Sequence, residues 1–349
     1  VQGRRQRRDI ETLNSHPSRW SCPAVRRGFF YDGSFRYKLE FNITSSRTRR
    51  SEDPDPRDFH AYSFMLVRII SIILLMLVIT QATRAGEPLL VYAGAASKPP
   101  TEEAAAAFTE ATGIEVDVLF GVSGYVLSQL KLARHGDLYF PGSSDYMEKA
   151  KRDGDVIAAT ERIIVYLVSA INVQKGNPKD IRTLEDLARP GIRVAIANPD
   201  GVCVGSYAVE IIDRRMNKEL KAGFRNNLVN YVGSCSKTAS AISLKAVDAV
   251  IGWRVFQHWD PDRIETIPLQ PEQVQRIGYI PIAITRYSKQ PEKAQRFIDF
   301  LLSPEGQAIF ARYQYFSTAD AAMQWVGSSK PIGGEYIVPD EWLSPAKNP

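Results

Sequence analysis

From residue 87 onward the chain alternates between short apolar runs and longer amphipathic stretches, and this alternation restricts the fold most strongly. PLLVYAG (88–94) is typical of a buried strand, and PPTEEAAAAFTEATG (99–113) of a helix with early acidic residues and a glycine stop. IEVDVLF (114–120) then alternates like a strand. Repeated strand and helix units predict a mostly parallel sheet with helices on both faces.

The same rhythm continues to residue 316. We interpret RIIVYLVSAIN (162–172) and YIPIAIT (279–285) as long strands, and we expect the chain to cross between two sheets near 166–173 and 278–284. In the tail, Ser303 is suited to cap a second helix that begins at Pro304.

The sequence therefore predicts an α/β protein of two doubly wound lobes joined by a hinge. We expect five parts along the chain: an upstream extension that is not native (1–64), a signal peptide (65–85), the first lobe (86–167), the second lobe (168–278), and a return to the first lobe with C-terminal helices (279–349).

The signal peptide prediction rests on residues 65–85. Met65 and the basic Arg68 precede an apolar run that is shorter than the ~20 residues of a membrane-spanning helix, and small residues at Thr83 and Ala85 suit a cleavage site. We expect export to the periplasm and a mature chain that begins near Gly86. A retained membrane anchor is the alternative.

The basic residues are concentrated upstream of that signal. The whole chain has a formal charge of +5 and a pI of about 9.0, yet residues 1–64 alone hold 13 Arg or Lys against 8 Asp or Glu. Without this segment and the signal peptide the net charge is about −2, which argues against a nucleic-acid partner. We interpret residues 1–64 as an over-extended reading frame; a basic arm that binds nucleic acid would leave the signal peptide unexplained.

Two cysteines, Cys203 and Cys235, lie in the expected mature part, and Cys22 lies upstream. In an oxidising compartment the pair is suited to a disulfide, while two buried, packed thiols are the alternative. The sequence contains no CxxC or HExxH spacing, so it predicts no metal site.

Four glycine- and serine-rich turns precede predicted helices. The first N–H groups of a helix have no partner within it and carry the positive end of its dipole, so such turns favour an oxyanion. One turn alone is usually just a cap, but four on one scaffold point to a shared anion site. The turns are AGAASK (93–98), GVSG (121–124), NPDGVCVGS (198–206) and GSCSKTAS (233–240).

Catalytic motifs are weak in comparison. GVSGY resembles a nucleophile elbow, but Tyr125 stands where that motif needs its last glycine. His135 and His258 are the histidines of the expected mature part, and neither has a triad setting. We therefore predict a protein that is not an enzyme and needs no cofactor, with a secreted serine hydrolase that uses Ser123 as the alternative of a different class.

Segments across residues 87–320 resemble the molybdate- and tungstate-binding class II periplasmic proteins of ABC transporters. They include GDLYFPGS (136–143), NPDGVCVGSYA (198–208), AVDAVIGW (246–253) and FLLSPEGQAIFARYQYF (300–316), in the family's order. The resemblance implies two lobes that close on a tetrahedral oxyanion, a membrane permease as partner, and a monomer.

The same resemblance assigns site residues. Serines of the first two turns correspond to Ser97 and Ser123; the third turn matches the pattern V-P-x-G-x-Y except that Cys203 replaces proline; and Trp253 stands where a tyrosine is common. The predicted ligand-binding residues are Ser97, Ser123, Gly124, Val204, Gly205, Lys237, Thr238 and Trp253, with Lys98, Cys203, Ser206, Tyr207, Ser236 and Arg254 as secondary candidates.

The charge of the donors decides the ligand. A cleft of neutral donors selects fully deprotonated anions such as molybdate, tungstate or sulfate, because the proton of an acid phosphate finds no acceptor there. Lysine or arginine in the cleft would also favour carboxylates or phosphate esters. The leading prediction is molybdate or tungstate, and another anion on the same scaffold is the alternative.

Overall fold

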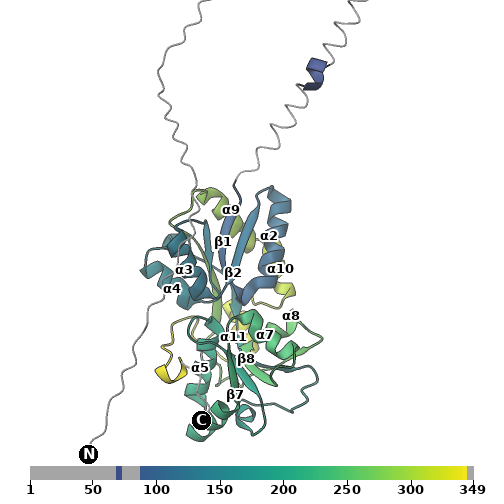
Figure 1. The fold of residues 1–349 in the computed structure, drawn as a ribbon, viewed down its shortest axis with the longest axis vertical. Helices are drawn as coiled ribbons and strands as arrows, with labels where there is room; N and C mark the ends of the chain where they lie inside the picture. The colour runs from purple at the N-terminus through teal and green to yellow at the C-terminus, as the bar shows by residue number, and fades with distance from the viewer. Residues whose placement is uncertain (1–67, 73–86, 344–349) are drawn as a thin grey trace, which may run out of the picture. The chain divides into compact units, whose positions relative to one another are not determined.

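The computed structural model describes residues 68–72 and 87–343 (Figure 1). Residues 87–343 belong to one compact unit of the chain, and the other unit, residues 1–68, lies almost wholly outside the described residues. The predictions for 1–64 and for most of 65–85 therefore also lie outside them. Within the described ranges, no helix has the length and apolar character needed to cross a membrane.

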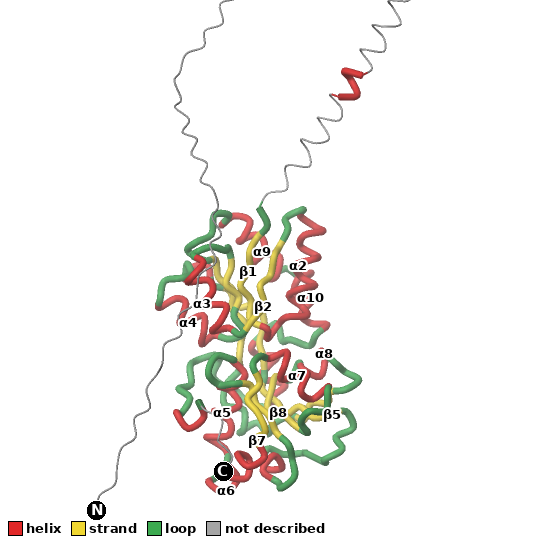
Figure 2. Tube along the Cα trace, in the orientation of Figure 1, coloured by secondary structure: helices red, strands yellow, loops and turns green. Residues whose placement is uncertain are grey.

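Two five-stranded sheets form the two lobes (Figure 2). The sheet of the first lobe has the order β2-β1-β3-β10-β4; β1 runs parallel to β2 and β3, and β10 runs antiparallel to β3 and β4. Its strands are β1 (Leu89–Gly94), β2 (Val116–Gly121), β3 (Leu138–Phe140), β4 (Arg162–Leu167) and β10 (Gly278–Ile284).

The sheet of the second lobe repeats this arrangement with the order β7-β6-β8-β5-β9. Strand β6 runs parallel to β7 and β8, and β5 runs antiparallel to β8 and β9. Its strands are β5 (Ser169–Gln174), β6 (Val194–Ala197), β7 (Leu228–Val232), β8 (Ala249–Trp253) and β9 (Ile264–Ile267). The predicted α/β fold with two lobes is confirmed.

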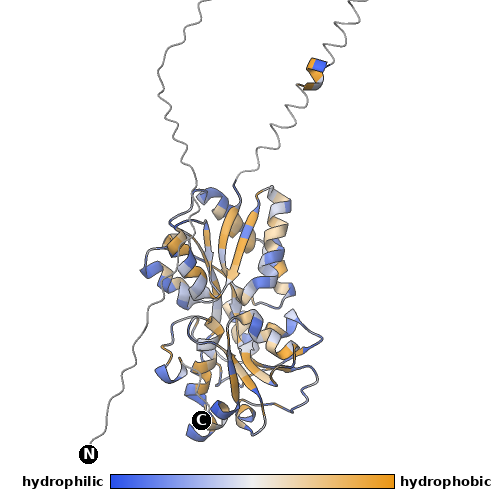
Figure 3. Ribbon diagram, viewed as in Figure 1, coloured by the Kyte–Doolittle hydropathy of each residue, from blue (hydrophilic) through white to orange (hydrophobic). Residues whose placement is uncertain are grey.

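Helices pack on both sheets because the inner strands, such as β1, β3, β6 and β8, are apolar and buried along nearly their whole length (Figure 3). The first lobe carries α2 (Lys98–Thr112), α3 (Ser123–Ala133), α4 (Ser144–Arg152), α9 (Pro291–Leu302) and α10 (Pro304–Arg312). The second carries α5 (Cys203–Arg215), α6 (Lys218–Asn227), α7 (Cys235–Ser243) and α8 (Phe256–Trp259). Short 3-10 turns are η1 (Ala95–Ser97), η2 (Ala158–Thr160), η3 (Glu185–Ala188) and η4 (Asp340–Trp342).

The cap at Ser303 is confirmed. Its Oγ accepts a hydrogen bond of 3.2 Å from the Gly306 N–H, and Pro304 occupies the first position of α10. This satisfies one of the free N–H groups that begin a helix.

The first crossing between the sheets lies within the predicted range 166–173, and the second does not lie in its predicted range. The run 162–172 is not one strand: β4 ends at Leu167, β5 begins at Ser169, and the two strands belong to different sheets. The second crossing lies between β9 and β10, in residues 268–277, because all of 278–284 pairs within the first sheet. An uninterrupted apolar run does not reveal the residue at which one strand ends and the next begins, since both sheets bury it.

The end of the chain also differs from the prediction, which placed all of 279–349 with the first lobe. Helices α9 and α10 pack there. Helix α11 (Ala319–Val326) contacts β4 of the first lobe, but its Ala322 and Val326, together with Trp342, lie in the hydrophobic core of the second lobe. Arg225 of the second lobe stacks on Trp342, 3.8 Å from the ring centroid. The burial of these apolar side chains decides which lobe they join, and their position in the chain after α10 does not.

An aromatic cluster between α2 and α9 stabilises the first lobe. The Phe108 and Phe297 rings meet edge to face with centroids 5.1 Å apart, and both side chains are buried. We expect Phe297→Ala to lower the free energy of unfolding by about 3–5 kcal/mol, because it leaves a cavity in a packed core. Denaturant unfolding measures this change.

The matched control is Arg296→Ala, which changes an exposed position on the same helix. It is expected to shift the stability by no more than about 0.5 kcal/mol. Equal losses in the two variants would contradict this account of the core.

Candidate anion-binding site

Four strands end at helix N-termini that face the space between the lobes. In the first lobe, β1 leads into η1 and α2, and β2 leads into α3; in the second, β6 leads into α5, and β7 leads into α7. Ligands on sheets of this kind lie beyond the carboxyl ends of the strands. The elements η1 and α7, which belong to different lobes, are in contact.

All four turns meet at one small, tightly closed cavity. No charged side chain among the described residues lines it. It is lined by Ala95, Ala96, Gly121, Val122, Ser123, Val202, Cys203 and Cys235. The structure therefore brings together helix N-termini from both lobes around a space that offers backbone N–H groups, one hydroxyl and two thiols.

Ser123 is the hydroxyl of this cavity. It is the first residue of α3 and is almost fully buried. Its Oγ accepts a hydrogen bond of 3.0 Å from the Gly142 N–H, and its carbonyl accepts one from the Tyr139 hydroxyl. Because a hydroxyl has one proton to donate, accepting from Gly142 leaves the Ser123 proton free to donate to another acceptor.

Gly142 closes the site from the first lobe, and the sequence analysis missed it. A Cβ added there would lie 2.7 Å from the Ala96 Cβ, 3.0 Å from the Cys203 Sγ and 3.4 Å from the Ser123 Oγ. Only a glycine allows three turns to approach this closely. The signal was present in the sequence, because PGSS (141–144) is a fifth glycine- and serine-rich turn, between β3 and α4.

The two thiols come from the second lobe. Cys203 and Cys235 are the first residues of α5 and α7, both are buried, and their Sγ atoms lie 3.9 Å apart without a disulfide. The hydrogen bond with Cys235, together with burial, raises the pKa of the Cys203 thiol well above its usual value. The Cys203 thiol is therefore neutral near pH 7, and its S–H is a weak donor.

Other predicted residues lie in the turns without lining the cavity. Ser97 is buried, and its Oγ accepts a hydrogen bond of 3.0 Å from the Thr101 hydroxyl. Val204 and Gly205 lie in the first turn of α5; Gly205 has the Ala197 carbonyl so close that a Cβ would clash. Gly124 lies in the first turn of α3.

The predicted residues of α7 are held by their own helix. Ser234 caps α7 by accepting a hydrogen bond from the Lys237 N–H, and the Thr238 hydroxyl donates to the Ser234 carbonyl. The Lys237 side chain is exposed, and Ser236 lines a different surface pocket with Lys98. These side chains are not brought to the cavity.

The remaining cations also lie elsewhere. Lys98 forms an ion pair with Glu102 at 3.6 Å. Arg254 stacks on Phe316 at 4.3 Å, and burial lowers its pKa to about 10. The sequence does not show whether these basic side chains face the site, because a basic residue beside a turn can point along either face of the helix.

Trp253 and Tyr207 form a buried pair behind the site. Their rings meet edge to face with centroids 4.9 Å apart, and neither the indole N–H nor the phenol hydroxyl has a hydrogen-bond partner among the described residues. A Cβ on Gly278, the first residue of β10, would lie within 3.4 Å of both side chains. They pack where the chain enters β10 rather than in the cavity.

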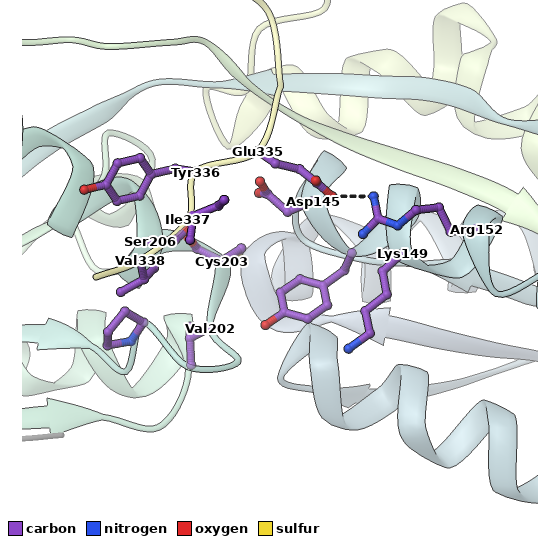
Figure 4. A pocket seen from close by; sticks show the side chains of 12 residues that line it. Asp145, Lys149, Arg152, Val202, Cys203, Ser206, Glu335, Tyr336, Ile337 and Val338 are labelled. Carbon is purple, nitrogen blue, oxygen red and sulfur yellow. Dashed lines mark hydrogen bonds and ion pairs between the residues drawn. The ribbon is translucent and has the colours of Figure 1, made fainter. Parts of the chain in front are cut away.

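A larger, charged cavity of about 260 Å³ adjoins the anion cavity and shares Val202 and Cys203 with it (Figure 4). Figure 4 shows side chains from α4, α5 and residues 335–338 around it, with Arg152 paired to Glu335 at 2.9 Å. Ser206 lines it, and its hydroxyl donates to the Cys203 carbonyl. The charges of this region are thus outside the anion cavity.

A buried ion-pair network joins the lobes behind this outer cavity. Arg276 contacts Glu210 of α5 at 2.8 Å and Asp145 of α4 at 3.2 Å, and it stacks on Tyr207 at 3.8 Å. Burial raises the pKa of Asp145, and the Arg276 guanidinium opposes this shift. The network fixes α4 against α5 and so holds the two sides of the site together.

Comparison with known proteins identifies relatives with the same fold. A family model described as bacterial extracellular solute-binding protein matches residues 89–315. A binding protein of Haemophilus influenzae is 27% identical over 247 residues, which is 67% of this chain and 93% of that protein. The molybdate-binding protein ModA of Rhodobacter capsulatus is 22% identical over 238 residues, 66% of this chain and 88% of that protein.

Solved structures show the same architecture. The sulfate-binding protein SubI of Mycobacterium tuberculosis H37Rv matches with a TM-score of 0.59 at 18% identity, covering 70% of this chain and 93% of that one. The two-lobe α/β arrangement is thus that of the class II periplasmic binding proteins.

The contact at Gly142 leads to a testable prediction. We expect Gly142→Ala to weaken anion binding at least tenfold, because the added Cβ collides with Ala96 and Cys203 in the closed form. Calorimetric titration with molybdate and sulfate measures the affinity, and the thermal melt of the free protein reports its fold.

Gly233→Ala is the matched control, since a Cβ at Gly233 meets nothing within 4 Å. Its affinity should equal that of the wild type. Wild-type affinity in Gly142→Ala would show that binding does not need this close approach.

Proposed function

Because the chain belongs to the bacterial extracellular solute-binding protein family, we propose that it captures a fully deprotonated tetrahedral oxyanion, molybdate or tungstate, for import by an ABC transporter. The observation that carries this proposal is the cavity at the four helix N-termini, which has donors from both lobes. We propose a periplasmic location and a membrane permease as partner, which are features of such transport systems.

The lining of the cavity supports this class of ligand. Ser123, Cys203 and Cys235 supply its polar side-chain atoms, and the rest of the lining is apolar side chain and backbone. Such donors satisfy an anion whose oxygens all accept, while a protonated phosphate oxygen would bury a donor without a carboxylate partner. For this reason a neutral cavity rejects hydrogen phosphate.

Capture would follow from closure of the lobes. The lining comes from both lobes, so an anion that contacts all four turns binds the closed form better than an open one and shifts the population toward it. Closure around the ligand, rather than a reaction, is the proposed role.

Sulfate is the second candidate ligand. It is tetrahedral and unprotonated at neutral pH, and a sulfate-binding protein of Escherichia coli K12 is 26% identical over 226 residues. That match covers 60% of this chain and 64% of the sulfate-binding protein. The neutral lining of the cavity suits both classes of anion.

The hydrolase alternative has less support. Ser123 Oγ accepts from a backbone N–H, and neither histidine of residues 87–343 lines the cavity. His135 instead lies 3.8 Å from Glu87 at an exposed position, and His258 lies on α8. We therefore propose binding rather than catalysis at Ser123.

Mutation can test separately whether Ser97 and Ser123 contribute to anion binding. We expect Ser123→Ala to weaken molybdate or tungstate binding about 10- to 100-fold, the loss of one hydrogen bond to a charged group. The double variant Ser97→Ala/Ser123→Ala tests both predicted serines, and Ser97→Ala alone should have the smaller effect because Ser97 does not line the cavity. Calorimetry against molybdate, tungstate, sulfate, phosphate and a dicarboxylate gives the affinities.

Ser240→Ala, at an exposed serine of α7, is the control and should bind as the wild type does. Unchanged affinity in the double variant would remove the serine assignment. Binding of only phosphate or the dicarboxylate would contradict the proposed ligand class.

The pH dependence tests the neutral lining. We expect sulfate affinity to stay constant within about twofold from pH 6 to 8, because sulfate does not titrate there and the raised pKa keeps the Cys203 thiol protonated. Titrations at several pH values and constant ionic strength measure this. A steady loss of affinity as the pH rises would indicate a thiolate facing the anion.

A further inference from the structure

The cavity contains a feature that oxyanion capture alone does not require: two thiols that face each other. Cys203 and Cys235 lie 32 positions apart, begin two different helices and both line the cavity, with Sγ atoms 3.9 Å apart. A disulfide needs a sulfur separation of about 2.05 Å, so small movements of the two side chains would allow a bond.

Both thiols belong to the second lobe, and the first lobe covers them. The site that an added Cβ would occupy at Gly142 is 3.0 Å from the Cys203 Sγ, and Ala95 and Ala96 form the same wall of the cavity. Separation of the lobes would therefore uncover Cys203 and Cys235 without moving them apart. In the closed form each residue is only 3% exposed.

We propose that Cys203 and Cys235 are a reversible disulfide-forming pair inside the anion site, and that its oxidation lowers the affinity for the anion. The oxidant is a small or protein disulfide. One cysteine thiolate attacks that disulfide and releases the first reduced thiol; the second cysteine attacks the mixed disulfide and releases the other. The two protons lost from the cysteines end on the released thiols or in water, and two electrons pass to the oxidant.

The effect on affinity follows from the position of the pair. Oxidation removes both S–H donors from the lining of the cavity and brings the two Sγ atoms from 3.9 Å to bonding distance, which changes the surface that an anion would contact. An anion that holds these turns in the closed arrangement opposes the bond. Because coupling between two equilibria is reciprocal, the anion must disfavour oxidation by the same factor by which oxidation weakens anion binding.

Burial also explains why the anion would protect the reduced pair. Only the thiolate attacks a disulfide, and the raised pKa of the Cys203 thiol in the closed form keeps it protonated. Oxidation is thus a reaction of the open form. The coupling between oxidation and anion binding rests on the proposed function. The formation of the disulfide does not depend on the proposed function.

The experiment uses the full chain in buffers of reduced and oxidised glutathione, with and without saturating molybdate. Peptide mapping by mass spectrometry measures the fraction of the Cys203–Cys235 disulfide, and so excludes any contribution from Cys22. We expect the disulfide to form without anion, and molybdate to shift its midpoint to more oxidising buffer. The oxidised protein should bind molybdate at least tenfold more weakly, with recovery after treatment with dithiothreitol.

The control is the double variant Cys203→Ala/Cys235→Ala, whose affinity, whatever its value, should not change with the glutathione ratio. A wild-type chain that stays reduced in oxidised glutathione without anion would overturn the proposal. So would a disulfide that changes the affinity by less than twofold. If the reduced chain binds no tetrahedral oxyanion, the proposed function fails, while the mapped disulfide still decides whether the pair exists.

Discussion

The closed arrangement of the site depends on side chains of both lobes packing closely against the backbone at Gly142. The N–H of this residue donates to Ser123, and its missing side chain leaves room for Ala96 and Cys203. Any larger residue would collide with Ala96 of the same lobe and press against Cys203 of the other lobe. The dipoles of the helices that begin here act over a short range, so their convergence on one point depends on this close packing.

Two chain crossings make the convergence possible. The chain leaves the first sheet after β4, builds the whole second sheet, and returns at β10. Each sheet has three parallel strands whose carboxyl ends carry the turns, and an antiparallel strand next to a crossing: β10 in the first sheet and β5 in the second. The packing of Trp253 and Tyr207 against Gly278 fills the space where the chain re-enters the first lobe.

Much of this could be predicted from the sequence because the relevant signals are local. Apolar runs that end in glycine- and serine-rich turns gave the strands, the helix starts and the four turns of the cavity, and Ser303 marked its own cap. The residue at which β4 ends and β5 begins has no local signal, since both strands are apolar. The local sequence does not determine the direction of a side chain either. Lys98 and Lys237 lie beside the turns, but their side chains face a neighbouring acid or solvent.

The position of β10 has a consequence for the order in which the protein can assemble. The first sheet has a gap between β3 and β4 until residues 278–284 exist, although its other strands end by residue 167. The strands of the second sheet occupy the continuous stretch 169–267. A chain that emerges from the ribosome N-terminus first therefore carries an unfinished first lobe through most of its synthesis, and contacts of such long sequence separation form slowly.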